Sequence, residues 1–175
     1  MESSPCFQWQ TTEEHGATFS PTPPMSTIML LLAICCTLEW DVKHWDLGNA
    51  FCGTDLKGRE IYVKPPQGCP GVKPGTLWRI KKWVYGLQES NREFYNAFKT
   101  LVLSFKPEGG GSIECCNSEP CLYIVKNKEG KVICYVIAYV DDLITADRSD
   151  GKKISMELTQ HIRQGWSIIL EDELC

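Results

Sequence analysis

The sequence predicts an α+β domain in which helices are segregated from an antiparallel sheet. Three stretches of the chain carry apolar residues in a helical pattern, and residues 121–146 have the pattern of three strands joined by tight turns. The chain has 175 residues, of which 43% are hydrophobic. It is therefore long enough for one domain with a hydrophobic core.

The composition excludes the class of stand-alone nucleic-acid binders. Eighteen Lys and Arg residues against 22 Asp and Glu residues give a net charge of −4, whereas such binders are strongly basic. A nucleic-acid role would need a local basic patch or neighbouring domains. The ten cysteines lie in adjacent pairs or singly in apolar runs, without zinc-ligand spacing. We expect reduced cysteines in an intracellular protein, cytoplasmic or nuclear.

The first third of the chain predicts an irregular start, one helix and one strand. Residues 1–14 are polar and acidic and are expected to be irregular. Residues 25–40 are expected to form a helix, with Ser26 or Thr27 as its cap. The apolar part of this helix has 11 residues, well short of the about 20 that span a bilayer, so we expect a helix buried in protein and no membrane partner. Residues 41–47 then suit a short strand.

The middle of the chain predicts two strands and a second helix. Residues 61–64 suit a short strand, and the loop that follows contains four prolines and three glycines. Residues 76–87 alternate apolar and basic side chains, as a half-exposed strand does. Residues 91–105 place aromatic and aliphatic side chains at helical spacing.

The last third predicts the centre of the sheet and a third helix. In residues 121–146 one turn falls at 127–130 and a second falls at the adjacent aspartates, Asp141 and Asp142. Residues 151–166 are amphipathic and predict the last helix.

Asp141 and Asp142 are the most informative pair of residues. Two carboxylates a few ångströms apart repel one another by about 4 kcal/mol at an effective dielectric of about 20, unless they are protonated or bridged by a cation. Asp-Asp is also a common way to end a strand at a hairpin turn. The alternative is a site for hard divalent cations such as magnesium, which needs a third carboxylate from elsewhere in the chain.

The stretch "AYVDDLI" resembles the Tyr-x-Asp-Asp motif of reverse transcriptases, and its surroundings resemble the copia-type retrotransposon branch. The stretches "ATFSPTPPMSTIMLLLAICC", "WDLGNAFCGTDLKGREIYVKPPQG", "LWRIKKWVYGLQESNREFY" and "SEPCLYI" are similar to further blocks of that family, in the family's order. The resemblance implies a palm-like antiparallel sheet with helices packed on one face, incomplete fingers and no thumb. It divides the chain into an N-terminal segment (1–14), a partial reverse transcriptase palm (15–166) and a C-terminal tail (167–175).

The resemblance also assigns candidate site residues. In "WDVKHWDLGNAF" the family pattern fits Asp46 and not Asp41, which lies five residues too early, so Asp46 is expected to join the aspartate pair as the third catalytic and metal-binding carboxylate. Phe51 resembles the aromatic residue that packs under the incoming sugar, with core packing as its alternative role. The residues expected to contact nucleotide or template are Phe51, Tyr85, Gly86, Ser90 and Tyr139.

The function implied by the resemblance is RNA-directed DNA polymerisation. It implies two magnesium ions, with manganese as a possible substitute, held by Asp46, Asp141 and Asp142. Its implied partners are an RNA or DNA template with a primer, deoxynucleoside triphosphates, and other polyprotein parts such as integrase and ribonuclease H. The alternative is a catalytically inactive remnant or interaction module, because Glu89 places a negative charge near the expected phosphates, where the family commonly has glutamine.

Overall fold

A six-stranded antiparallel sheet forms the centre of the protein, in a computed structural model that describes residues 9–10, 19–56, 58–148 and 154–173. The α+β class predicted from the sequence is confirmed. Residues 121–146 form three consecutive strands joined by tight turns, as predicted. In spatial order the strands are β5 (Gly111–Cys115), β6 (Leu122–Asn127), β7 (Val132–Tyr139), β8 (Asp142–Asp147), β2 (Asp41–Gly48) and β9 (Ser167–Glu173).

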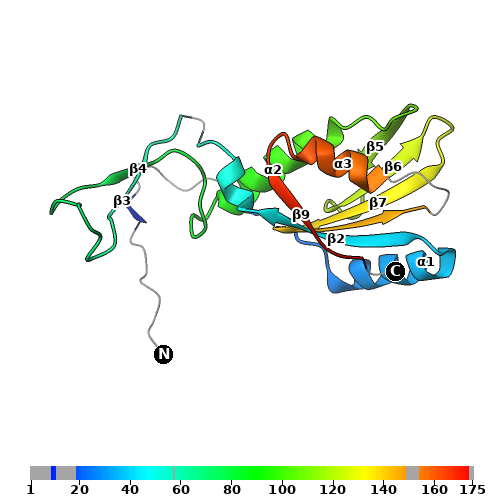
Figure 1. The fold of residues 1–175 in the computed structure, drawn as a ribbon, viewed down its shortest axis with the longest axis horizontal. Helices are drawn as coiled ribbons and strands as arrows, with labels where there is room; N and C mark the ends of the chain where they lie inside the picture. Colours follow the sequence, from blue (N-terminus) through cyan, green and yellow to red (C-terminus); the bar gives the residue numbers. More distant parts are fainter. Residues whose placement is uncertain (1–8, 11–18, 57, 149–153, 174–175) are drawn as a thin grey trace.

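Helices cover both faces of this sheet, so the prediction that they pack on one face is wrong. The helices α2 (Ser90–Leu103) and α3 (Ile154–Ile162) lie on one face, and α1 (Met25–Leu38) lies on the other (Figure 1). Strand β7 explains this arrangement, because Val136 is buried with α2 and α3 whereas its neighbour Ile137 is buried with α1. A strand that is apolar on both faces must be covered on both.

The buried side chains form two hydrophobic clusters, one on each face of the main sheet. The larger cluster joins the α2 and α3 side chains to the sheet and includes Trp45, Phe94, Phe98, Val136, Leu158 and Trp166. The smaller cluster joins α1 to the opposite face and consists of Leu31, Cys35, Trp40, Val42, Ile137 and Ala146. The prediction that this helix is buried in protein is wrong, because α1 buries only Leu31 and Cys35, and Met29 and Leu30 on its other sides are more than 60% exposed.

A small three-stranded sheet projects to one side of the main body (Figure 1). It consists of β1 (Trp9–Gln10), β3 (Ile61–Val63) and β4 (Trp78–Ile80), in the order β1-β3-β4. The strand expected over residues 76–87 is therefore only three residues long. Gly86 adopts a positive φ of 93°, and the segment after β4 turns toward the main sheet instead of continuing as a strand.

The main sheet extends beyond the segment in which we expected the domain to end. Residues 167–173, expected to be a tail, form β9, which pairs antiparallel with β2. Most of the segment expected to be irregular, residues 1–14, lies outside the described residues. Among the described residues, no helix combines the length and the apolarity that crossing a membrane requires.

A buried carboxylate attaches α3 to the sheet. The Asp147 side chain, at the end of β8, accepts hydrogen bonds from the Ser155 backbone N–H at 2.9 Å and from the Ser155 hydroxyl. It also lies 3.7 Å from the Lys43 ammonium, and both charged side chains are almost fully buried. These contacts compensate the cost of removing both charges from water.

We expect Asp147→Ala to lower the free energy of unfolding by about 3 kcal/mol, because it leaves the Lys43 charge buried without its carboxylate. The measurement is urea unfolding of the wild-type and variant chains. Asp41→Ala is the matched control, because Asp41 lies opposite Asp147 in the β2–β8 register but is exposed, and we expect a change within about 0.5 kcal/mol. A loss below about 1 kcal/mol for Asp147→Ala would contradict the prediction.

Candidate active site

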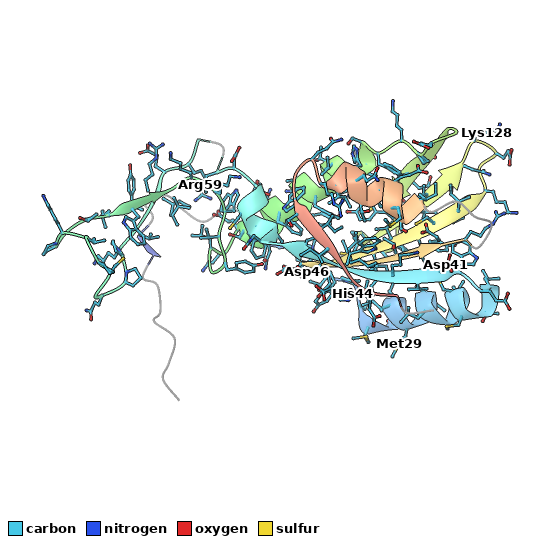
Figure 2. The ribbon with its side chains drawn as sticks, in the orientation of Figure 1. Met29, Asp41, His44, Asp46, Arg59 and Lys128 are labelled. Carbon is cyan, nitrogen blue, oxygen red and sulfur yellow. The ribbon has the colours of Figure 1, made fainter. Side chains whose placement is uncertain are left out.

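The β2–β8 pairing places two of the predicted catalytic carboxylates opposite one another. Asp46 on β2 is the register partner of Asp142 on β8. Side chains of directly opposed residues lie on the same face, with Cβ atoms about 4.5–5.5 Å apart. His44, two residues before Asp46, lies on that face as well and is a diagonal neighbour of Asp142. Figure 2 shows His44 and Asp46 along β2, with Asp41 at the far end of the strand.

The third carboxylate, Asp141, lies in the two-residue turn between β7 and β8. Tyr139 and Asp142 pair across this turn, and Val140 has a positive φ of 53°. This is an unfavourable conformation for a β-branched residue, so the turn stores backbone strain. The Leu47 backbone N–H donates to the Asp141 carbonyl at 2.6 Å, which attaches the turn to β2.

The carboxylates of the turn are bonded to side chains from distant segments. The Tyr85 hydroxyl donates to Asp141 Oδ2 at 2.6 Å. His44 Nε2 lies 2.8 Å from Asp142 Oδ1, a hydrogen bond in which an ionised carboxylate is the acceptor. Within the described part of the chain, Asp141 Oδ1 is buried and has no hydrogen-bond partner. Such an orphaned buried acceptor is uncommon in folded proteins and calls for a physical explanation.

The rings of Phe51 and Phe94 pack together next to the carboxylates. Phe51 lies in the short 3-10 helix η1 (Ala50–Gly53), is only 3% exposed, and meets the Tyr85 ring edge-on with the ring centroids 4.5 Å apart. It also packs against Phe94 of α2 at 5.7 Å. The Trp166 indole N–H donates to the Ala50 carbonyl at 2.5 Å and fixes η1 beneath the site.

Some of the residues predicted to contact nucleotide or template lie at this site, whereas Ser90 is buried. Tyr85 and Tyr139 are each about half exposed beside the aspartates, and Gly86 follows Tyr85 in the turn. Ser90 is buried at the start of α2, and its hydroxyl donates to the Val84 carbonyl at 2.6 Å. Ser90 therefore holds the segment that carries Tyr85.

Glu89 does not place an uncompensated charge at the site. Its carboxylate forms an ion pair with the Arg59 guanidinium, and its side chain is only 7% exposed. The same guanidinium lies 5.7 Å from the centroid of the Trp83 ring. The negative charge introduced at position 89 is thus neutralised within the protein.

His44 is the residue of the site that sequence analysis did not identify. The signal available was its position two residues before Asp46, which puts both side chains on one face if the segment is a strand. The partner of His44 could not be read from that spacing, because Asp142 lies 98 residues away.

The carboxylate oxygens of the site are suitable ligands for a hard cation, but the described side chains are not placed so that they could hold one. Carboxylate oxygens are the ligands magnesium prefers, and the buried Oδ1 of Asp141 accepts no hydrogen bond from the described residues. Among the described residues, however, no three His, Cys, Asp or Glu side chains form a group that could hold a metal ion. The metal-binding role of Asp46, Asp141 and Asp142 stays a prediction.

The structure places two adjacent aspartates where β7 turns into β8, and a third aspartate on the adjacent strand β2. The sequence comparison identifies the family. The chain belongs to the reverse transcriptase (RNA-dependent DNA polymerase) family, whose model matches residues 4–164.

Similar proteins are known from plants. The chain is 28% identical over 134 residues to the retrovirus-related Pol polyprotein from transposon TNT 1-94 of Nicotiana tabacum. This alignment covers 76% of the chain and 10% of that protein. It is 26% identical over 131 residues to the corresponding polyprotein from transposon RE2 of Arabidopsis thaliana, which covers 75% of the chain and 8% of that protein. The chain thus spans about a tenth of these relatives. No solved structure matches the chain.

The Tyr85–Asp141 hydrogen bond predicts an unusual titration. Partial burial, followed by the hydrogen bond to Asp141 and the charge of Asp141, raises the pKa of Tyr85 from 10.0 to about 12. Because the folded chain holds the proton more tightly than the unfolded one, this stabilisation is complete below pH 10 and is lost as the pH rises toward 12.

We expect one tyrosine to titrate near pH 12 in the ultraviolet absorbance of tyrosinate, and Tyr85→Phe should remove that transition. Asp141→Asn should move it toward the ordinary value, because it removes the negative charge beside the phenol. A Tyr85 transition near pH 10 in the wild-type chain would be evidence against the hydrogen bond.

Proposed function

We propose that this chain is the palm domain of an RNA-directed DNA polymerase of a copia-type retrotransposon. The observation that carries the proposal is the opposition of Asp46 and Asp142 across β2 and β8, with Asp141 in the adjoining turn. The match of residues 4–164 to the reverse transcriptase family supports it. So does the similarity to Pol polyproteins of plant transposons.

The proposed reaction extends a primer by one deoxynucleotide. The primer 3′-hydroxyl attacks the α-phosphorus of a deoxynucleoside triphosphate; the new P–O bond forms as the bond to pyrophosphate breaks, and the hydroxyl proton passes to water. The protein positions the reactants and compensates charge, and it takes no part in covalent chemistry. Two magnesium ions, or manganese in their place, would be held by Asp46, Asp141 and Asp142 and would supply positive charge to the phosphate oxygens.

The remaining residues of the site have roles that follow from their positions. Phe51 would support the deoxyribose, because packing against Phe94 holds its ring in place. Tyr139 and Gly86 would face the template–primer, because both are exposed next to the turn. An RNA or DNA template with its primer, and other polyprotein parts such as integrase and ribonuclease H, are the proposed partners.

A catalytically inactive remnant or interaction module is the second candidate function. One observation favours it: the aspartates of the site do not form a group that could hold a metal ion among the described residues. Activity therefore decides between the two candidates.

We expect the purified chain to extend a DNA primer on an RNA template with magnesium or manganese, and Asp142→Asn to abolish extension by removing a carboxylate from the site. Asp41→Asn is the matched control, because Asp41 is an exposed acid on β2, the strand that carries Asp46, and we expect it to leave extension unchanged. The readout is primer lengthening on a denaturing gel. A folded wild-type chain that extends no primer would favour the inactive remnant.

We expect Phe51→Val to admit ribonucleotides, because a smaller side chain leaves room for the 2′-hydroxyl of the sugar. The ratio of kcat/KM for deoxy- and ribonucleotides measures this selectivity. The substitution should also lower the free energy of unfolding by about 1–3 kcal/mol, because Phe51 is buried. Lower stability with unchanged selectivity would assign Phe51 to the core alone.

A further inference from the structure

Helix α1 is apolar on all sides, but the chain covers only one of them. None of its 14 residues is charged, and its buried residues are Leu31 and Cys35. A helix that is hydrophobic all round is normally buried all round. The large apolar side chains that α1 exposes to solvent, each between 38% and 66% exposed, are Met25, Met29, Leu30, Ile34 and Leu38. A single copy of the chain therefore leaves this helix half covered.

The uncovered side of α1 lies on the outside of the molecule. Figure 1 shows α1 as the outermost element below the sheet, and Figure 2 shows Met29 on the side of the helix turned away from the sheet. With about 3.6 residues per turn, Ala33 lies opposite the buried pair Leu31 and Cys35, between Met29 and Leu30. The middle of the uncovered side is thus a small side chain flanked by two large ones.

The uncovered side of α1 can lose its contact with water at little cost. The Thr37 hydroxyl on this side already donates to the Ala33 carbonyl at 2.8 Å. A hydroxyl that is satisfied within its own helix needs no further partner when it becomes buried. A contiguous exposed apolar surface of this kind marks a place where another molecule binds.

The lack of charge on α1 determines which surface can cover it. A charged side chain pressed against this side would be buried without a partner, so the covering surface must be uncharged and apolar. Of the described helices, α2 carries Arg92, Glu93 and Lys99, and α3 carries Glu157, so α1 itself is the one that offers such a surface. A helix bound to an anionic lipid surface carries Lys or Arg on its polar side, and α1 has neither.

We propose that the uncovered side of α1 binds the α1 helix of a second copy of this chain, in an antiparallel pair with its two-fold axis at Ala33. Such an interface is isologous, so Met29 of each copy lies against Thr37 of the other, because both are four residues from Ala33. The small Ala33 side chain lets the two helices approach closely, and their antiparallel dipoles attract one another. This side of α1 contains none of the predicted site residues, so the inference is independent of the proposed function.

The pairing predicts a dimer that dissociates on dilution. We expect sedimentation equilibrium to give twice the mass of one chain at high concentration and to approach the mass of one chain as the protein is diluted. Met29→Glu buries a charge on each side of the interface, and we expect it to raise the Kd of the dimer at least about tenfold. Met156→Glu is the matched control, because Met156 on α3 is 40% exposed and lies outside the interface, and its Kd should equal that of the wild type.

Each outcome decides the inference. A wild-type dimer that Met29→Glu weakens and Met156→Glu does not supports the pairing; Ala33→Glu replaces Met29→Glu if circular dichroism shows that the latter does not fold. A wild-type chain with the mass of one copy at every concentration overturns the pairing, and so does a dimer that the α1 variants leave intact. A mass above twice that of one chain also overturns it, because a two-fold pair is closed. Binding of a monomeric chain to phosphatidylcholine vesicles would assign this side of α1 to a lipid surface instead.

Discussion

The antiparallel pairing of β2 with β8 is the constraint on which the site depends. It sets Asp46 opposite Asp142, and a slip of one residue would move one of the two carboxylates to the other face of the sheet. The two-residue turn between β7 and β8 fixes this register from one side, and the bond from the Leu47 N–H to the Asp141 carbonyl fixes it from the other. Backbone hydrogen bonds therefore determine where the carboxylates lie.

Strand β8 carries one carboxylate at each end, and the two have different surroundings. Asp147 is buried and is fully compensated by Lys43 and two donors from Ser155, so it holds α3 to the sheet. Asp142 is half exposed, faces another carboxylate, and is bonded to His44. Complete compensation gives stability, whereas a carboxylate with one polar partner and open solvent remains available to a ligand.

The sequence predicted those features that depend on local patterns. Helix α2 and the strands around the aspartate turn follow from periodicity, and α1 follows from its apolar run. The family pattern predicted Asp46 as the third carboxylate, and the structure places it opposite Asp142. The face of the sheet on which each helix packs could not be predicted from the sequence. An apolar strand such as β7 indicates that both faces are covered, but it does not indicate which helix covers which face. The bond between Tyr85 and Asp141 joins residues 56 apart, a tertiary contact that no local spacing encodes.

Phe51 is held in place by several aromatic neighbours, of which Tyr85 is only one. Phe51 contacts both Tyr85 and Phe94, and Phe94 packs in turn against Phe98 and Trp166. The bond from Trp166 to the Ala50 carbonyl holds the backbone of η1 independently of Tyr85. Loss of the Tyr85 contact therefore removes one edge-to-face pair, worth about 0.5–1.5 kcal/mol, from a ring that keeps its other neighbours. The position of Phe51 therefore depends on the cluster as a whole and not on its contact with Tyr85 alone.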